Sequence, residues 1–424
     1  MQFLSISYKY LLELTPLPSN IDTDIAMPSK SFVSFRFWHF FAVLGLSVVA
    51  FQFGMMWQAG AGERKPSNPN TVVMPGPTNR TDRASPNTPR TIRAEYSAQS
   101  ALLIGANDLI RYHQSVFKEM VKAVHGEIPI IGFVNSDDEA DLGQDLLAEA
   151  GLPCTAVNFI KQPLDSMWIR DYGPHFARGV DGTVKIQSAV YKPDVNQARE
   201  HDGELSSYIG RVLNLEVESM PIAIEGGNLL VNGDGMIVTS TRVLERPENR
   251  SYTLQQIGNL LQTHLGCRLW VYLKPLAGEP TGHIDFCLTF LRRNLVVVGK
   301  YDKAYDPVNA ELLDRMAQTL TGQPTTMGPL VVERIPMPPR TKEGDWLSYC
   351  NILLINGTIL MPSFTGVDPA LESAAKKVYA RLMPSWKIVT INSDTLVKRR
   401  GVLHCVGITV PAYVNALPLI SEAM

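Results

Sequence analysis

The sequence predicts an α/β fold assembled from repeated strand–helix–strand units. From about residue 92 onward, stretches with apolar residues at helical spacing alternate with the short apolar runs that are typical of strands. Polar clusters separate these units at intervals of 54, 58, 68 and 54 residues, counted along Asp171, Glu225, His283, Asn351 and Cys405. We therefore expect units of about 55 to 65 residues, each of which delivers one polar cluster to a common centre. A layered α/β domain without internal repetition is the alternative.

The individual helices and strands follow from local patterns. In the first helix, apolar residues recur at helical spacing from Leu109 to Val124. Gly151 and Pro153 end the second helix, and the run Asn232-Gly233-Asp234-Gly235 predicts a hairpin turn ahead of a strand. We expect helices at residues 108–124, 139–150, 204–213, 254–265, 309–320 and 369–382. We expect strands at residues 101–104, 129–134, 218–224, 268–276, 331–336 and 386–391.

An apolar run at residues 37–57 has no Asp, Glu, Lys or Arg and is long enough to span a bilayer. Lys30 and Arg36 precede it, and Ala59-Gly60-Ala61 suits signal-peptide cleavage. We expect residues 1–36 to be an N-terminal cytoplasmic or n-region and residues 37–62 to be a signal-peptide core or a membrane anchor. The bulk of the chain would then be exported to the periplasm or the cell exterior, or be anchored by one N-terminal transmembrane helix. A buried core helix is the alternative.

The stretch at residues 63–92 is rich in Pro, Asn, Thr, Ser and Arg. Such a composition offers little apolar surface to bury, so it predicts a disordered linker. We expect the folded domain at residues 93–424.

The charge and the cysteine content argue against a nucleic-acid-binding or metal-binding protein. The 39 Lys and Arg residues nearly balance the 41 Asp and Glu residues, so bulk charge predicts no nucleic-acid partner. The five cysteines show no Cys-x-x-Cys pair and no zinc-like spacing, so no metal is predicted. Their odd number leaves at least one thiol unpaired in an exported protein, and an unpaired thiol there is a candidate nucleophile.

The first two polar clusters offer groups for a planar cation. Trp168 supplies an aromatic face for stacking, and Asp171 supplies a carboxylate for bidentate hydrogen bonds to a guanidinium. A structural bridge between Arg170 and Asp171 is the alternative. In the second cluster, a Gly-Gly pair lets the backbone turn sharply, and Glu225 and Asn228 are candidates to line the site.

The later clusters supply a proton-transfer group and a nucleophile. His283 and Asp285 lie two positions apart in a predicted strand, so their side chains would share one face, although a structurally paired His-Asp is the alternative. Cys405 follows basic residues at 398–400, which would favour a thiolate, and an inert core cysteine is the alternative. A cysteine protease also uses Cys and His, but peptide hydrolysis has no need for Trp168 with two separate aspartates.

Four motifs in this order resemble the Porphyromonas-type peptidyl-arginine deiminase and agmatine deiminase family over roughly residues 92–415. They are Trp168-x-Arg170-Asp171-x-Gly173-Pro174, Glu225-Gly226-Gly227-Asn228, Gly282-His283-x-Asp285 and His404-Cys405. The resemblance implies a pentein α/β propeller, with five strand–helix units around a central active site. It also implies hydrolysis of a guanidinium to a ureido group, such as citrulline or N-carbamoylputrescine, and ammonia, on a small guanidino or peptidyl-arginine substrate. No cofactor would be needed, and residues 93–424 would be the deiminase catalytic domain.

The resemblance also implies a role for each matched residue. Cys405 would attack the guanidinium carbon, and His283 would protonate the leaving ammonia and then activate the hydrolytic water. Asp171 and Asp285 would each hold guanidinium nitrogens. Substrate-binding roles are expected for Trp168, Arg170, Glu225, Asn228 and Asn351.

Two features depart from the family pattern. Family members often carry a glycine run before the His-Cys pair, whereas this chain has Lys398-Arg399-Arg400 and only Gly401. The variable stretch at residues 191–199 is expected to contact the far end of the substrate, and it offers Lys192 and Arg199 as candidates for a carboxylate. An amidinotransferase of the same superfamily and a catalytically silent guanidinium-binding module are the alternative functions.

Overall fold

The structure, a computed structural model, describes residues 70–74, 90–192 and 199–423, all within the unit Pro66–Met424. The segments predicted at residues 1–36 and 37–62 lie outside the described residues. None of the helices in the described part combines the length and the apolar character that a membrane crossing requires.

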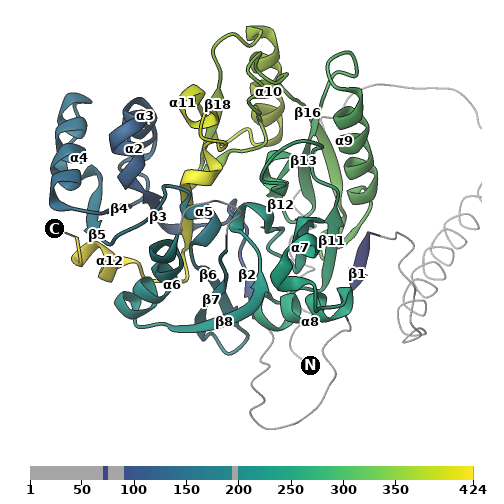
Figure 1. Ribbon diagram of the computed structural model, residues 1–424, viewed down its shortest axis with the longest axis horizontal. Helices are drawn as coiled ribbons and strands as arrows, with labels where there is room; N and C mark the ends of the chain where they lie inside the picture. Colours follow the sequence, from purple (N-terminus) through teal and green to yellow (C-terminus); the bar gives the residue numbers. More distant parts are fainter. Residues whose placement is uncertain (1–69, 75–89, 193–198, 424) are drawn as a thin grey trace, which may run out of the picture. The chain divides into compact units, whose positions relative to one another are not determined.

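Short strands and helices alternate along the described chain (Figure 1). The strands are β1 (Thr71–Val73), β2 (Arg90–Ile92), β3 (Gln99–Gly105), β4 (Ile130–Val134), β5 (Asn158–Lys161), β6 (His175–Gly179), β7 (Val184–Val190), β8 (Glu216–Ala223), β9 (Leu230–Val231), β10 (Met236–Ser240), β11 (Leu269–Leu273), β12 (Leu288–Arg292), β13 (Leu295–Lys300), β14 (Pro324–Thr325), β15 (Gly328–Pro329), β16 (Val331–Pro336), β17 (Leu353–Ile355), β18 (Thr358–Ser363), β19 (Lys387–Asn392) and β20 (Gly407–Pro411). The α-helices are α2 (Ala106–Tyr112), α3 (Gln114–Val124), α4 (Asp137–Glu149), α5 (Ile169–Tyr172), α6 (Glu200–Leu213), α7 (Arg242–Glu245), α8 (Leu254–Leu265), α9 (Pro307–Leu320), α10 (Pro369–Leu382), α11 (Asp394–Val397) and α12 (Leu417–Ser421). The 3₁₀ helices are η1 (Cys154–Ala156), η2 (Gly226–Asn228), η3 (Pro247–Asn249), η4 (Ile284–Phe286) and η5 (His404–Val406).

One connection recurs in five sheets. An antiparallel pair of strands leads into a helical crossover, and the next strand lies parallel to the second strand of the pair. The five instances are β6-β7-α6-β8, β9-β10-α8-β11, β12-β13-α9-β16, β17-β18-α10-β19 and β20-β3-α2-α3-β4. In the last instance the C-terminal strand β20 pairs with β3, so strands from opposite ends of the folded unit share one sheet. The predicted repetition is confirmed in strand order and direction.

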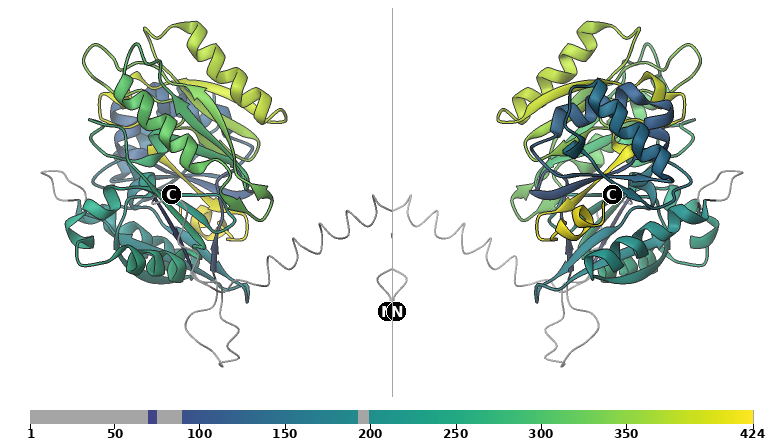
Figure 2. Two further views of the ribbon diagram at one scale, coloured as in Figure 1. Left: turned by 90° about the vertical axis from the view of Figure 1, so that its right-hand side faces the viewer. Right: turned by 90° about the vertical axis from the view of Figure 1, so that its left-hand side faces the viewer.

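The connecting helices lie at the periphery of the folded unit and the strands lie inside it (Figures 1 and 2). Strand β13 illustrates the reason for this arrangement. Val296, Val297 and Val298 are all fully buried, so other elements must pack against both faces of this strand. Helix α10 contributes the fully buried Tyr379, whose hydroxyl donates a 2.8 Å hydrogen bond to the backbone carbonyl of Tyr349.

Most predicted elements agree with the structure, and α8 and α10 have the predicted bounds. The helix predicted at residues 108–124 is wrong in one respect, because it is broken into α2 and α3 at His113. The His113 backbone leaves the helical region with ψ 41°, and its ring Nδ1 lies 2.9 Å from the Thr395 hydroxyl. The apolar spacing continues across the break, so periodicity alone could not locate it.

The prediction of a disordered linker at residues 63–92 is wrong for the residues that form β1 and β2. Strand β1 pairs antiparallel with β11, and β2 pairs antiparallel with β6. Arg90 in β2 is buried and forms an ion pair with Glu218. Composition missed both strands because their stabilisation comes from hydrogen bonds to the edges of distant sheets. The other residues of the range, 63–69 and 75–89, lie outside the described residues.

Each predicted polar cluster lies just before the strand that opens one of the five recurring connections. Helix α5 carries Asp171 ahead of β6, and Glu225 lies at the start of η2 ahead of β9. His283 lies at the start of η4 ahead of β12, Asn351 precedes β17, and η5 carries Cys405 ahead of β20. Repeated units thus present equivalent segments, which explains the near-constant spacing of the clusters in the sequence.

Candidate active site

One cavity joins residues from four of the five polar clusters. Trp168, Asp171, Glu225, His283 and Cys405 all line it. His283 and Cys405 are only 6% and 5% exposed, so the reactive groups lie at the buried end of the cavity. The rest of the wall consists of Tyr191, Arg199, Arg242, Arg246, Pro280, Thr281, Phe286, Arg399 and Arg400.

His283 lies between two carboxylates. Its Nδ1 is 3.6 Å from Asp171 Oδ1, and its Nε2 is 3.9 Å from Glu225 Oε2. Burial by itself would lower the pKa of His283, but the charges of Asp171, Glu225 and Asp285 together raise it above the ordinary value. The facing carboxylates therefore favour the protonated imidazole, which suits a general acid.

Asp171 is harder to ionise than an ordinary aspartate. Burial raises the pKa of Asp171 to about 6, with His283 opposing the rise and Glu225 and Asp285 adding to it. The backbone N–H of Gly227 donates a 3.3 Å hydrogen bond to Asp171 Oδ1. A bound cation would relieve the repulsion among these acids and favour the charged form of Asp171.

Gly227 is needed because three reactive side chains meet at its Cα. A Cβ at this position would lie 2.5 Å from His283 Nδ1, 3.0 Å from Asp171 Oδ1 and 3.2 Å from Asp285 Oδ2. At Gly226, a Cβ would lie 2.0 Å from the backbone carbonyl oxygen of Arg170. Neither glycine has a positive φ. The Gly-Gly pair therefore serves close approach, in addition to the turn that the sequence predicted.

The substitution Gly227→Ala is expected to lower kcat/KM by about 100-fold, because a methyl group would displace His283 and the facing carboxylates by a large part of an ångström. Steady-state kinetics on any turned-over guanidino substrate measures this effect. Gly203→Ala in α6 is the matched control, because a Cβ there meets no atom within 4 Å. Equal kinetics for the two variants would contradict the steric role of Gly227.

The prediction that His283 and Asp285 lie on a strand is wrong, because they belong to the start of η4. The loop before η4 is held by the buried Glu279, whose carboxylate accepts hydrogen bonds from the backbone N–H groups of Thr281 and Gly282 at 3.1 and 2.6 Å. The Thr281 hydroxyl in turn accepts from the His283 backbone N–H at 3.2 Å. A 3₁₀ turn brings both side chains to one region, as the strand would have done.

A buried chain of alternating charges lies behind the cavity. Asp285 Oδ2 is 2.7 Å from His404 Nδ1, and His404 Nε2 is 3.2 Å from Glu95 Oε2. Burial and the nearby Arg170 would lower the pKa of His404, but Glu95 and Asp285 raise it. Burial would raise the pKa of Glu95, but Arg170 and His404 lower it to about 2. Each ring nitrogen of His404 thus faces a carboxylate oxygen, an arrangement that favours the protonated ring and fixes the orientation of Asp285.

Asp285 does not line the cavity, but one of its carboxylate oxygens is available to accept another hydrogen bond. It is 1% exposed, and its Oδ1 has no hydrogen-bond partner within the described residues. A buried carboxylate oxygen without a partner is costly, and a bound guanidinium N–H would satisfy it.

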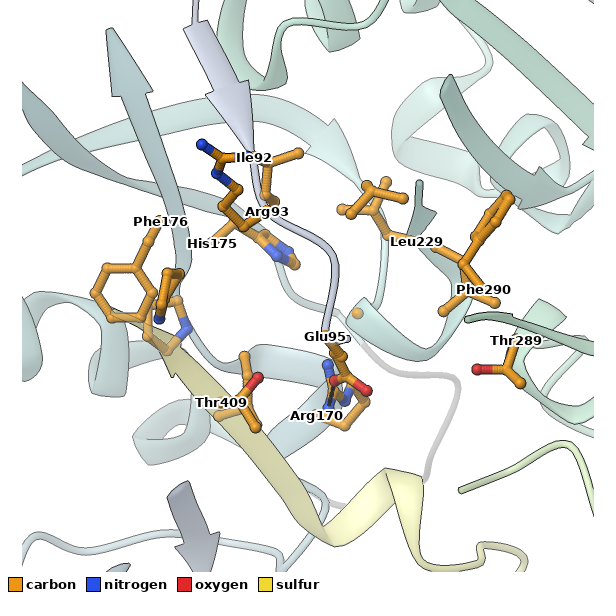
Figure 3. Close-up of a pocket in the computed structure, with 16 residues that line it drawn as sticks. Ile92, Arg93, Glu95, Arg170, His175, Phe176, Leu229, Thr289, Phe290 and Thr409 are labelled. Carbon is orange, nitrogen blue, oxygen red and sulfur yellow. Dashed lines mark hydrogen bonds and ion pairs between the residues drawn. The ribbon is translucent and has the colours of Figure 1, made fainter. Parts of the chain in front are cut away.

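The prediction that Arg170 binds substrate disagrees with its position. Its guanidinium forms an ion pair with Glu95 and donates a 3.2 Å hydrogen bond to the His404 carbonyl. The proposed bridge to Asp171 is likewise absent among the described contacts of Arg170. Figure 3 shows Arg170 and Glu95 together in a second cavity, which His175, Phe176 and Leu229 also line. Arg170 thus supports the buried charge chain.

Asn351 and Asn228 hold the backbone around the cavity and do not line it. Asn351 Oδ1 accepts a 2.9 Å hydrogen bond from the His404 backbone N–H, and its Nδ2 lies 3.7 Å from Cys405 Sγ. Asn228 Oδ1 accepts a 2.7 Å hydrogen bond from the Ser240 backbone N–H. Both side chains are buried, so we assign them positioning roles.

The surroundings of Cys405 favour the neutral thiol. Burial raises the pKa of Cys405 well above its ordinary value, and the charges of Asp285 and Asp171 raise it further. This shift opposes the expectation that residues 398–400 favour a thiolate, and none of these three residues is among its causes. Lys398 is engaged elsewhere, with its Nζ 2.6 Å from Asp345 Oδ2. The other four cysteines are also free, and Cys154 is the exposed one.

Several wall residues were missed by the sequence analysis. Arg246 is buried and pairs with Glu225 at 3.3 Å, and it also donates a hydrogen bond to the Lys192 carbonyl. Arg199 does line the cavity, whereas Lys192 does not, and residues 193–198 lie outside the described residues. Neither Glu95 nor Arg246 lies in a recognisable motif. No local signal could have linked them to the site, because the site residues that they contact, Arg170 and His404 for Glu95 and Glu225 for Arg246, lie in other segments of the chain.

Within residues 70–74, 90–192 and 199–423, no group of three or more His, Cys, Asp or Glu side chains is arranged to hold a metal ion.

Comparison with known proteins places this site in a family. The family described as Porphyromonas-type peptidyl-arginine deiminase matches residues 94–411. Agmatine deiminase of Stutzerimonas stutzeri is 25% identical over 336 residues, which cover 70% of this chain and 87% of that protein. Agmatine deiminase of Pseudomonas putida is 26% identical over 315 residues, which cover 65% and 83%. In fold, the solved agmatine deiminase of Enterococcus faecalis matches with a TM-score of 0.65 at 19% identity, covering 78% of this chain and 98% of that one.

The family match and the similarity to agmatine deiminases identify the chain as a hydrolase that acts on C–N bonds of linear amidines. The family match covers most of the chain. The chain belongs to the Porphyromonas-type peptidyl-arginine deiminase family.

Proposed function

We propose that this protein hydrolyses the guanidinium group of a small guanidino compound or of peptidyl-arginine, through a covalent intermediate on Cys405. The observation that carries the proposal is the single cavity in which Cys405, His283, Asp171 and Glu225 meet. A thiol, a protonated imidazole and an excess of carboxylates at a buried site suit a cationic electrophile with an amine leaving group.

The carboxylates of Asp171 and Asp285 bind the cation. Asp171 and the unpaired Oδ1 of Asp285 can each accept N–H bonds from one guanidinium, and charge-assisted bonds of this kind are among the stronger hydrogen bonds in proteins. Trp168 lines the same cavity and offers an aromatic face to the planar group. Holding the cation between these groups fixes its carbon near Cys405.

The bound cation also prepares the nucleophile. The charges of Asp285 and Asp171 help to keep the pKa of Cys405 high, so a guanidinium that neutralises them lowers it again and the thiol proton leaves to solvent. Cys405 Sγ then bonds to the guanidinium carbon. His283 gives its proton to one nitrogen, the C–N bond breaks and ammonia leaves, which produces a thiouronium on the cysteine.

Hydrolysis returns the enzyme to its starting state. The neutral His283 takes a proton from water, whose oxygen bonds to the same carbon. The C–S bond breaks and Cys405 leaves as a thiolate. The protonated ureido product gives its extra proton to this thiolate, which restores the thiol, and is released. Histidine therefore acts first as general acid and then as general base.

The test is release of ammonia and of ureido product by the full-length chain with agmatine, free arginine, and peptides with internal or C-terminal arginine. We expect both products in equal amounts from at least one of these compounds. Product that appears only after an amine acceptor is added would indicate an amidinotransferase instead. Binding of a guanidino compound without any product would indicate a silent binding module.

Two finer features belong to the same proposal. We infer that the five repeated sheets form the pentein propeller around the cavity, which the shared strand order supports. We also infer that residues 37–62 direct export or anchor the chain, as their apolar run suggests. The N-terminal residue of the protein recovered from cells distinguishes cleavage after Ala61 from an intact anchor, and an intact chain recovered from the cytosol would contradict both.

A further inference from the structure

A second cavity adjoins the buried charge chain and shares no lining residue with the active-site cavity. Its wall includes residues of β6, β9, β12 and β20, which are the strands that open four of the five recurring connections. Neighbouring residues are divided between the two cavities. Asp171 and Glu225 line the active-site cavity, whereas Arg170 and Gly226 line the second cavity. The two cavities therefore lie on opposite sides of the segments that carry the reactive groups.

The second cavity is lined by one acid, which an arginine already neutralises. Glu95 forms an ion pair with Arg170, and its carboxylate also lies 3.2 Å from His404 Nε2. His175 lines the same wall (Figure 3). Burial lowers the pKa of His175 to about 4, and the nearby Arg170 adds to this effect, so the neutral ring is favoured. These groups offer no uncompensated negative charge, which disfavours a cationic ligand.

Arg93 brings a positive charge to this cavity that no described acid compensates. Within the described part of the chain, its guanidinium forms no ion pair and no hydrogen bond. The charge of Arg93 acts on Tyr96 and Tyr413, but burial raises the pKa of both phenols to about 12, so neither supplies a negative charge near neutral pH. The hydroxyls of Thr289 and Thr409 also line the cavity and form no hydrogen bond with a described residue (Figure 3). One cation and two hydroxyl donors are therefore available to an anion.

The size and the apolar part of the wall narrow the class of anion. The cavity has a volume of about 80 Å³. A bound water needs about 10–15 Å³ of such volume, so the cavity accommodates a ligand the size of roughly five to eight waters. Much of the remaining wall is apolar and includes Ile92, Phe176, Leu229 and Phe290. A single uncompensated guanidinium matches a single negative charge, and the apolar side chains match a short hydrocarbon chain. A short-chain monocarboxylate meets all of these conditions.

We propose that the second cavity is an effector site, which binds a short-chain monocarboxylate such as butyrate and thereby lowers turnover at the active site. Arg93 holds the carboxylate by charge-assisted hydrogen bonds, for which the planar guanidinium is suited. The Thr289 and Thr409 hydroxyls donate further hydrogen bonds, and the hydrocarbon chain packs against Leu229 and Phe290. The effect on turnover rests on the proposed function, whereas the binding of the carboxylate does not.

Arg170 connects the second cavity to the active site. Its guanidinium lines the second cavity, pairs with Glu95 and donates a 3.2 Å hydrogen bond to the backbone carbonyl of His404, the residue before Cys405. The Arg170 Nη1 group forms no hydrogen bond with a described residue, so it is free to donate to a bound carboxylate. A carboxylate there competes for the guanidinium and loosens its hold on the backbone at Cys405. We therefore expect a lower kcat and an unchanged KM, because effector and substrate occupy different cavities.

Calorimetric titration of the full-length chain with butyrate measures the site without any turnover. We expect one butyrate per chain. The affinity should stay the same in the Cys405→Ser chain when a guanidino substrate without a carboxylate saturates the active-site cavity. Phosphate, which carries more charge and has no hydrocarbon chain, should bind at least tenfold more weakly. Displacement of butyrate by the guanidino compound, tighter binding of phosphate, or no binding of butyrate at millimolar concentration would each overturn the proposal.

Variants assign the bound carboxylate to the second cavity. Arg93→Gln should weaken butyrate binding at least tenfold, the factor that corresponds to about 1.4 kcal/mol. Arg93 is partly exposed and has no ion pair among the described residues, so loss of folding is not expected. Thr409→Val removes one donor and should weaken binding about fivefold. Arg293→Gln is the control, because Arg293 is exposed and does not line the cavity. Equal affinity of Arg93→Gln and the wild type would contradict the assignment.

Steady-state kinetics with the best guanidino substrate tests the effector role. Saturating butyrate should lower kcat at least fivefold in the wild type and in Arg293→Gln, and it should have no effect on Arg93→Gln. A rise in KM alone would show competition at the active site, and an unchanged kcat with butyrate bound would show that the cavity is no effector site; either result overturns the proposal. If no guanidino compound yields a ureido product, the proposed function is wrong, and the titration still decides whether the second cavity binds a carboxylate.

Discussion

Replacing Cys405 with serine is expected to lower the turnover of guanidino substrates by roughly 10⁴-fold or more, while the substrate still binds. Serine has nearly the shape of cysteine, so the buried position keeps its packing. Its hydroxyl is a much weaker acid than the thiol, and a bound guanidinium cannot lower its pKa far enough to yield an anionic nucleophile. Ammonia release measures turnover, and calorimetric titration with the best substrate measures binding.

Cys154→Ser controls for the loss of a thiol as such. Cys154 is exposed in η1 and does not line the cavity, so its substitution should leave both turnover and binding unchanged. Turnover by Cys405→Ser within tenfold of the wild type would remove the covalent step from the mechanism. A variant that loses both binding and thermal stability would show that the thiol is mainly a core residue.

Replacing Asp171 with asparagine is expected to raise KM by about 100-fold and to lower kcat as well. Asparagine keeps the shape of the side chain but removes one of the charges that hold the guanidinium. It also removes a charge that supports protonation of His283, whose Nδ1 lies 3.6 Å away. The exposed Asp141 in α4 provides the control Asp141→Asn, which should behave as the wild type.

The pH dependence of kcat/KM gives a second measure of Asp171. Because burial raises the pKa of Asp171 to about 6, the free enzyme loses this charge as the pH falls through that value. In the wild type, kcat/KM should therefore decline on the acid side of about pH 6. Asp171→Asn should lose this limb of the profile, since asparagine does not titrate. An unchanged acid limb in the variant would assign it to another group.

Composition and spacing predicted much of the fold because its signals are local. Apolar periodicity located α8 and α10 at their observed bounds, and the Asn-Gly-Asp-Gly run marked the turn between β9 and β10. Periodicity did not find the break between α2 and α3, since the apolar face continues through it. It also missed β1 and β2, whose hydrogen-bond partners β11 and β6 are remote in sequence.

The sequence by itself determined which reactive groups the chain possesses and that they recur at the spacing of a repeated unit. Trp168, Asp171, Glu225, His283 and Cys405 could be chosen on chemistry and order alone, and they line one cavity. Chemical type and chain order are properties of the residues themselves, so no folding information was needed to select them.

Only the tertiary structure decided how these groups are ionised and what supports them. Arg170 pairs with Glu95 instead of Asp171, and burial favours the neutral thiol of Cys405 despite the basic residues before it. The physical reason is that ionisation depends on burial and on charges within a few ångströms, which come from segments far apart in the chain. Arg93 shows the same limit, because its place at the second cavity exists only once the sheets have assembled.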